Sequence, residues 1–187
     1  MSRALVQERK LTADEFYDAY AGSDVRADLV DGKVVEMPPA GPEHGALDSD
    51  LHFHLKLFVR EHVLGRLFTN TGFILFPDRQ DVRGPDEAFV SNEKIAQAPL
   101  PSRGFWRVVP DLVIEIVSPD DRAPDIADKV ADYAEARVPL TWVVYPRRQQ
   151  VYIHRPGERV EIIGPDGTVD GGKVLPGFRL PLSELWT

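Results

Sequence analysis

Two hydrophobic periods alternate along this chain, and they indicate where its helices and strands lie. Leu47, Leu51, Leu55 and Phe58 recur at helical spacing in the segment 42–62, which predicts the longest helix. In the segment 11–20, a threonine is followed three residues later by a glutamate, a capping-box pattern that predicts a short helix. The segment 124–137, "PDIADKVADYAEAR", gathers its apolar residues on one side and predicts a further helix.

Strands are indicated by alternating or continuous apolar runs. The segment 26–37 alternates around Asp31-Gly32, the dipeptide type that best supports a tight hairpin. The segment 106–118 is apolar on both faces, which is typical of a central strand. We expect further strands at 66–77, 86–91 and 140–146, a hairpin at 149–163 and an extended edge at 175–186.

These elements predict an α/β fold, α+β in some classifications, with a central mixed sheet flanked by helices. The strand, helix and strand between 106 and 146 favour a right-handed crossover, so the core runs in the order α-β-β-β-α-β. An N-terminal helix and hairpin precede this core, and a C-terminal β-hairpin follows it. A length of 187 residues and an apolar content of 43% suit one domain with a substantial core. We expect a single domain over 1–187, with its core at about 42–146.

Composition restricts the chemistry. The net charge of −8 argues against a protein that coats nucleic acid, although a local basic patch and a bound metal still permit action on a phosphodiester. The absence of cysteine excludes thiolate metal sites, which favours a hard ion, magnesium or manganese, held by oxygen or histidine. No leader opens the chain, and no apolar run approaches the roughly 18 residues that span a bilayer. We therefore expect a cytoplasmic protein that does not enter a membrane.

The strand that is apolar on both faces carries one acidic residue in its middle, Glu115. A buried carboxylate is costly to desolvate unless a cation meets it, and the long stem of Lys129, in the following helix, can return to the strand. Asp111 shares a face of this strand, but four strand residues span about 13 Å, too far for one magnesium ion. Asp86 lies where the chain enters a neighbouring strand, so its carboxylate can come closer to that of Glu115 than the carboxylate of Asp111 can. Because a single lysine leaves excess negative charge, we expect a divalent cation at Asp86 and Glu115.

Several motifs of this chain occur together in a known family. "PDEAFV", "PDLVIEIVSP" and "VPLTWVVYP", with the series Asp125, Lys129 and Tyr133, resemble the Uma2 family of putative restriction-type endonucleases, within the PD-(D/E)XK nuclease superfamily. The resemblance covers about 28–146. It implies a restriction endonuclease-like fold and a magnesium- or manganese-dependent endonuclease that hydrolyses phosphodiester bonds, with DNA favoured over RNA and a homodimer expected by analogy.

The resemblance also implies roles for individual residues. Asp86 and Glu115 would bind the metal, and Lys129 would act from the helix in place of the lysine usually found two residues after the acid. The family usually has Glu-Leu before its early Asp-Gly turn, where this chain has Asp28, so Asp28 is a further candidate. Glu43 and His44 open the long helix, where Glu43 complements the helix dipole or one of the two approaches metal or substrate.

Two alternative functions stay open. In the first, the protein is a catalytically inactive binding or scaffolding protein, and Glu115 and Lys129 form a buried ion pair without catalysis. In the second, Asp86 and Glu115 are the acid and base of a hydrolase that needs no metal. Metal dependence separates these two alternatives from the metal-dependent nuclease.

Overall fold

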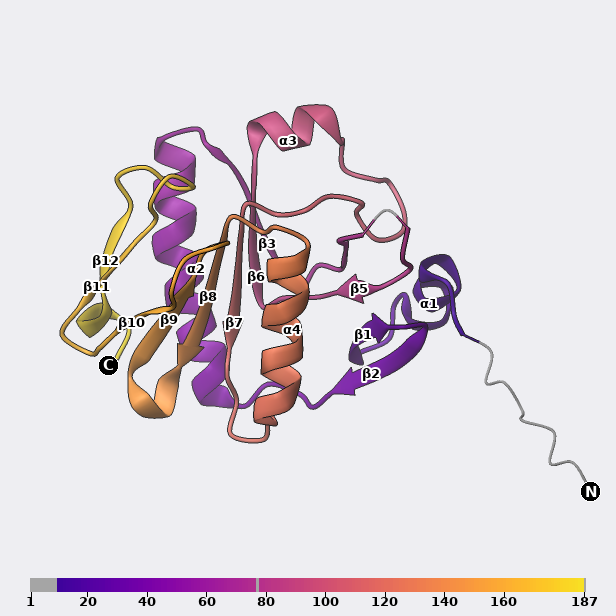
Figure 1. Ribbon diagram of the computed structural model, residues 1–187, viewed down its shortest axis with the longest axis horizontal. Coiled ribbons are helices and arrows are strands. Elements are labelled where there is room, and N and C mark those ends of the chain that lie inside the picture. The colour runs from indigo at the N-terminus through magenta and orange to yellow at the C-terminus, as the bar shows by residue number, and fades with distance from the viewer. Residues whose placement is uncertain (1–9, 77, 187) are drawn as a thin grey trace, which may run out of the picture.

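The computed structural model describes residues 10–76 and 78–186 (Figure 1). Its helices are α1 (Ala13–Tyr20), α2 (Pro42–Glu61), α3 (Asn92–Gln97) and α4 (Ala123–Glu135). Its strands are β1 (Arg26–Val30), β2 (Lys33–Met37), β3 (Gly65–Thr69), β4 (Phe73–Ile74), β5 (Val82–Arg83), β6 (Glu87–Ser91), β7 (Leu112–Ile116), β8 (Leu140–Tyr145), β9 (Gln150–His154), β10 (Glu161–Ile163), β11 (Thr168–Asp170) and β12 (Arg179–Pro181). None of the helices in these described ranges is long and apolar enough to cross a membrane.

A mixed six-stranded sheet in the order β10-β9-β8-β7-β6-β3 forms the centre of the molecule. Strands β7 and β8 are parallel and are joined through α4, whereas the other neighbouring strands of this sheet are antiparallel. Every residue of β7 is buried, as expected for a strand covered on both faces. The mixed α/β architecture predicted from the sequence is therefore confirmed.

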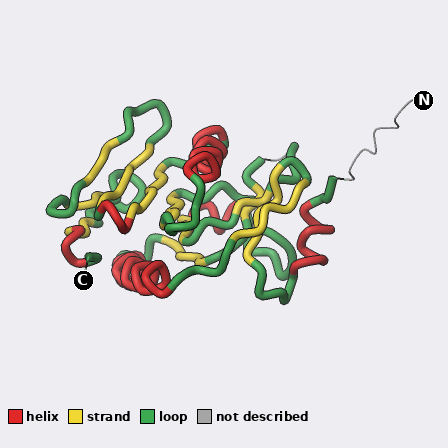
Figure 2. The backbone as a smooth tube through the Cα atoms, turned by 90° about the horizontal axis from the view of Figure 1, so that it is seen from below, coloured by secondary structure: helices red, strands yellow, loops and turns green. Residues whose placement is uncertain are grey.

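Helices α2 and α4 cover opposite faces of this sheet (Figure 2). Leu112 and Ile114 of β7 pack in one apolar cluster with Leu51 of α2, whereas Val113 packs in another with Tyr133 of α4. Because side chains alternate along a strand, Glu115 lies on the same face as Val113. The acid of the central strand therefore faces α4.

A smaller sheet in the order β2-β1-β5-β4 lies beside α4, with α1 packed on it (Figure 1). Phe16 of α1 is buried against Leu29 of β1 and Val82 of β5. The sulfur of Met37, at the end of β2, lies 3.6 Å from the ammonium of Lys129. This small sheet thus brings the β1-β2 hairpin to the side of the main sheet on which Glu115 lies.

Most of the elements predicted from the sequence are present. The capping box at Thr12 and Glu15 begins α1, and Pro42 occupies the first turn of α2, which ends at Glu61. The predicted helix at 124–137 corresponds to α4. The predicted hairpins correspond to β1-β2 and β9-β10, and the strand predictions 86–91 and 140–146 correspond to β6 and β8.

Three strand predictions were wrong in extent. The segment 66–77 is not one strand, because β3 pairs with β6 in the main sheet and β4 pairs with β5 in the small one. Asn70, with φ 46°, turns the chain between them. The strand predicted at 106–118 contributes only β7, since its earlier part, before Pro110, contacts β4 through Trp106. The segment 175–186 contributes β12, which pairs with β11 outside the main sheet.

Candidate active site

The residues proposed from the sequence gather around one cavity of about 350 Å³, between the β1-β2 hairpin, the start of α2, the end of β7 and α4. Five candidates line it: Asp28, His44, Asp86, Glu115 and Lys129. Glu43 is exposed at the start of α2 and is not among the lining residues. Of the two candidates at this helix end, only the histidine faces the cavity.

Glu115 is held by two donors from α4. The ammonium of Lys129 donates to one carboxylate oxygen at 2.9 Å, and the hydroxyl of Tyr133 donates to the other at 2.6 Å. Burial raises the pKa of Glu115, and the charge of Lys129 opposes that shift. Burial disfavours the charge on Lys129, but the carboxylates of Glu115 and Asp28 outweigh it and raise the lysine pKa. The lysine therefore stays charged inside the protein.

Lys129 and Tyr133 reach the same carboxylate because they lie four residues apart on one face of α4. The sequence predicted a cation for the buried acid, and the structure brings Lys129 to Glu115 as expected. Tyr133 lies on the buried side of α4. Its ring is fully buried, but its hydroxyl also fixes the orientation of Glu115, a function that its place in an apolar stripe did not indicate.

Asp86 lies directly before β6, beside the end of β7. The backbone N–H of Ile116 donates to its Oδ2 at 2.7 Å, and the guanidinium of Arg26 donates to its Oδ1 at 2.7 Å. The Nε2 atom of His44 lies 3.4 Å from Oδ2. Although burial opposes it, hydrogen bonds from His44 and Ile116 and the charge of Arg26 lower the pKa of Asp86 to about 2. Asp86 is therefore ionised at neutral pH.

Asp28 belongs to the same charged group. Arg83 donates to its Oδ2 at 3.1 Å, the backbone N–H of Gly84 donates to its Oδ1 at 2.9 Å, and Lys129 lies 4.0 Å from Oδ2. Arg83 also contacts Asp132 of α4 at 2.5 Å. Asp28 thus connects the β1-β2 hairpin to the pair on α4 and β7.

Contrary to what the sequence had suggested, Lys129 is not the only cation beside the buried carboxylates. Arg26 and Arg83 contribute two further cations, one on Asp86 and one on Asp28. One sequence signal could have identified Arg26, because Arg26 and Asp28 lie two residues apart on one strand and share a face. No such signal indicated Arg83, because it reaches Asp28 through a contact between distant segments, which local sequence patterns do not record.

The donor chemistry of the cavity fits a hard cation. Asp86 and Glu115 present carboxylate oxygens from neighbouring strands, and magnesium is often held by one or two carboxylates together with waters and substrate phosphates. Across residues 10–76 and 78–186, no group of three or more His, Cys, Asp or Glu side chains is arranged to hold an ion. The residues therefore suit an ion held by two carboxylates, for which Arg26 would have to release Asp86.

A second acidic site lies behind the cavity. Glu87 of β6 is fully buried, and its carboxylate lies 2.7 Å from Nδ1 of His52. Burial and the charge of Asp48 raise the pKa of Glu87 to about 9. His54, by contrast, lies 3.8 Å from Glu184, because residues two positions apart on a helix point in different directions.

Two comparisons with known proteins return matches. The family model of Uma2, described as "Putative restriction endonuclease", matches residues 13–183. A solved crystal structure described as a putative nuclease belonging to DUF820, from Anabaena variabilis ATCC 29413, is 22% identical, with a TM-score of 0.80 over 94% of this chain and 97% of that chain. This structural similarity shows a shared fold. A search of curated proteins finds no match.

Proposed function

The chain belongs to the Uma2 family, whose model spans residues 13–183, and on this basis we propose that it is a metal-dependent endonuclease that hydrolyses phosphodiester bonds in DNA. In this proposal Asp86 and Glu115 hold magnesium or manganese, and Lys129 acts on the reacting groups. The order α2, β3, β6, β7, α4, β8 supports a restriction endonuclease-like core, because it matches the expected α-β-β-β-α-β series.

One observation carries the proposal: a buried lysine and two carboxylates from adjacent strands line a single open cavity. Lys129 is 8% exposed and Glu115 is 3% exposed, yet both line the cavity with Asp86. Ion pairs in the interior are seldom retained for stability alone, because desolvation offsets much of their attraction. A charged group of this kind in a cavity is more typical of a catalytic site.

The residues of this chain would divide the work of hydrolysis. A bound divalent ion would polarise a phosphate oxygen and lower the pKa of a coordinated water. Lys129, held by Glu115, would orient the attacking water and stabilise negative charge that develops on the phosphate. Tyr133 would keep Glu115 in one orientation, and the backbone N–H of Ile116 would do the same for Asp86.

The inactive scaffold is supported by a specific observation as well. The three buried carboxylates of the cavity already have cationic partners: Arg26 contacts Asp86, Arg83 contacts Asp28 and Lys129 contacts Glu115. These three carboxylates therefore do not need a metal ion to balance their charge. The scaffold alternative therefore expects no metal binding and no cleavage, whereas the nuclease requires an ion to displace Arg26 from Asp86.

The metal-independent hydrolase is the second alternative. The cavity holds one carboxyl whose pKa is lowered to about 2, Asp86, and one whose pKa is raised, Glu115. Two carboxyls shifted in opposite directions can serve as base and acid. This alternative expects a hydrolytic activity that survives a chelator, which distinguishes it from the proposed nuclease.

A plasmid-nicking assay tests the proposal. Supercoiled DNA is incubated with the protein in magnesium, in manganese and in EDTA, and the nicked fraction is followed over time. We expect metal-dependent nicking that Asp86→Asn abolishes. Lys129→Met should lower turnover by about 10² to 10³ while metal affinity is kept, as for the loss of one well-placed group. Nicking by the parent protein that does not exceed the EDTA level would contradict the proposal.

Lys94→Met is the matched control for Lys129→Met. Lys94 also pairs with a carboxylate, that of Asp111, at 2.9 Å, but it is only half-buried and lies outside the cavity. Its variant should nick DNA at the parental rate. Equal losses in both lysine variants would show that Lys129 matters only through folding. By analogy with restriction-type enzymes, we also propose a homodimer, which sedimentation of the protein with and without DNA would test.

A further inference from the structure

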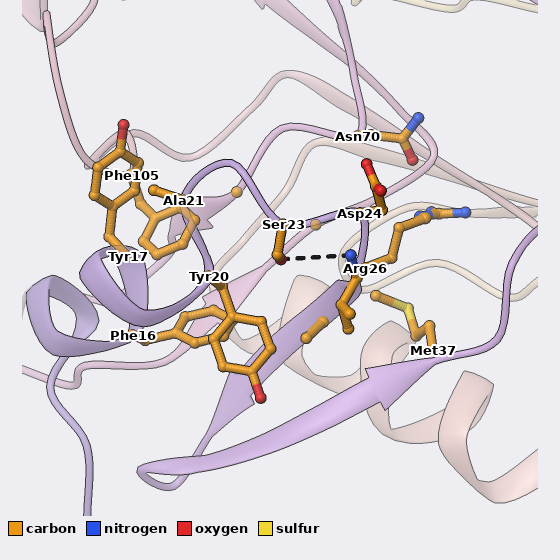
Figure 3. A pocket seen from close by; sticks show the side chains of 14 residues that line it. Phe16, Tyr17, Tyr20, Ala21, Ser23, Asp24, Arg26, Met37, Asn70 and Phe105 are labelled. Carbon is orange, nitrogen blue, oxygen red and sulfur yellow. Dashed lines mark hydrogen bonds between the residues drawn. The ribbon is translucent and has the colours of Figure 1, made fainter.

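A second cavity, of about 300 Å³, adjoins the candidate active site (Figure 3). Arg26 and Met37 line both cavities, so the two share a wall. The backbone N–H of Asn70, another lining residue, donates to the carbonyl oxygen of Asp86 at 3.1 Å. Whatever occupies the second cavity therefore lies next to the residues that would hold the scissile phosphate.

One side of this cavity is aromatic. Phe16, Tyr17 and Tyr20 of α1 and Phe105 line it, with the Phe16 and Phe105 rings stacked at 5.3 Å and Tyr17 edge-on to Phe105 at 5.4 Å. Phe16 is buried and belongs to the core, but the other three rings are half-buried and keep part of their surface free. A Cβ on Gly72 would collide with the Phe105 ring, so this glycine permits the ring to pack where it does.

The opposite side is polar. Ser23, Asp24, Arg26 and Asn70 line the cavity, and Figure 3 shows Asp24, Arg26 and Asn70 on the side opposite Tyr17 and Phe105. These side chains supply both hydrogen-bond donors and acceptors. A flat aromatic platform beside a polar rim matches the two needs of a nucleobase, stacking on its face and hydrogen bonding on its edge.

The size of the cavity limits the ligand to one ring system. Its volume of about 300 Å³ lies at the lower end of the range of about 300–1,000 Å³ for small-molecule sites. A base that is paired and stacked in a duplex has its edge and both faces occupied, so it enters such a site only after it leaves the stack. A single-stranded substrate meets this condition without the cost of unpairing.

We propose that this cavity binds one unpaired nucleobase of the substrate strand, beside the scissile phosphate, and that the protein prefers single-stranded over duplex nucleic acid. The inference rests on the proposed nuclease function and specifies its substrate. Arg26, which lines both cavities, lies between the base and the phosphate, and its guanidinium suits a phosphate oxygen once it leaves Asp86. Tyr17 and Tyr20 provide the stacking surface.

Binding measured without cleavage tests this inference separately from the function. A fluorescently labelled single-stranded DNA oligonucleotide, the same sequence as a duplex, and an abasic strand of equal length are titrated with the protein in EDTA, and anisotropy is recorded. We expect the single strand to bind more tightly than the other two ligands. Tyr17→Leu and Tyr20→Leu should each weaken single-strand binding about 10-fold, which corresponds to the loss of one stacked base, and should leave abasic-strand binding unchanged.

Tyr152→Leu is the control variant. Tyr152 is also half-buried and packs on another tyrosine ring at 4.7 Å, but it lines neither of the two cavities. Its variant should bind all three ligands as the parent does. An RNA strand of the same sequence, tested in parallel, identifies which nucleic acid supplies the base.

The outcomes separate the inference from the function. Parental affinity in both cavity tyrosine variants, or duplex binding as tight as single-strand binding, would overturn the inference, while metal-dependent nicking would still support the nuclease. Tyrosine-dependent single-strand binding without any cleavage would support the base site and count against the nuclease. Absence of binding to every strand would overturn the base site, and the nicking assay would then decide the function alone.

Discussion

Removal of the Lys129 ammonium should destabilise the protein more than neutralisation of the carboxylate that it contacts. Lys129→Met leaves Glu115, which is 3% exposed, with a hydrogen bond from Tyr133 and no ammonium. Breaking a buried ion pair from one side costs about 3–5 kcal/mol. Glu115→Gln keeps the shape and an acceptor, and Lys129 retains Asp28 at 4.0 Å, so this change should cost about 1–2 kcal/mol.

The double variant completes a thermodynamic cycle. Lys129→Met combined with Glu115→Gln should be more stable than Lys129→Met alone, because no carboxylate is stranded. Lys94→Met is the control, since its pair with Asp111 has the same 2.9 Å distance but its lysine side chain is 28% exposed, and it should cost about 1 kcal/mol or less. The free energies of unfolding come from urea titrations in EDTA, so that metal binding does not contribute.

The pH dependence of Lys129→Met gives an independent check. Burial raises the pKa of Glu115, and without the lysine nothing of opposite charge at 2.9 Å counters that shift. The folded variant therefore holds a proton that the unfolded chain releases, and its stability should fall relative to the parent as pH rises above 4.5, the ordinary pKa of a glutamate. Equal costs for the two single variants would refute the compensation of Lys129 by Asp28. A gap that does not change with pH would refute a buried charged pair.

Three further predictions concern neighbouring residues. Because the pKa of Glu87 is raised to about 9, the parent should become less stable as pH rises above 4.5. Glu87→Gln should remove this pH dependence and raise the free energy of unfolding by roughly 2–4 kcal/mol at about pH 8, measured by urea unfolding. Tyr133→Phe should cost about 1–2 kcal/mol and lower nicking turnover, because Glu115 loses its hydroxyl donor. Arg26→Gln should tighten magnesium binding in calorimetry, since it frees Oδ1 of Asp86; unchanged or weaker binding would contradict the required displacement.

The sequence predicted the centre of the candidate site because local patterns carried it. An acid within an apolar strand requires a cation, and Lys129 shares the sheet-facing side of α4 with Ile126 and Tyr133, which are both buried. Asp86 was expected near Glu115 because it begins a predicted strand beside the strand of Glu115, and β6 and β7 are indeed paired. These inferences depended on short-range periodicity and burial, which the amino-acid pattern records.

The remainder of the site depends on pairing between distant segments. Arg83 reaches Asp28 because β5 pairs with β1, a contact between residues 55 positions apart, and a two-residue strand leaves no periodic signal. The division of 66–77 into β3 and β4 follows from a left-handed turn at Asn70, which a residue other than glycine seldom adopts. The arginine partners of Asp28 and Asp86 were therefore missed although these two acidic residues were identified.

The most direct test of the account is calorimetric titration of magnesium and manganese into the purified protein. The account predicts that the parent binds a divalent ion, that Asp86→Asn and Glu115→Gln abolish the binding heat, and that Asp111→Asn, which alters a carboxylate outside the cavity, keeps it. Absence of binding heat in the parent protein, or parental binding heat in either cavity variant, would contradict a metal site at Asp86 and Glu115.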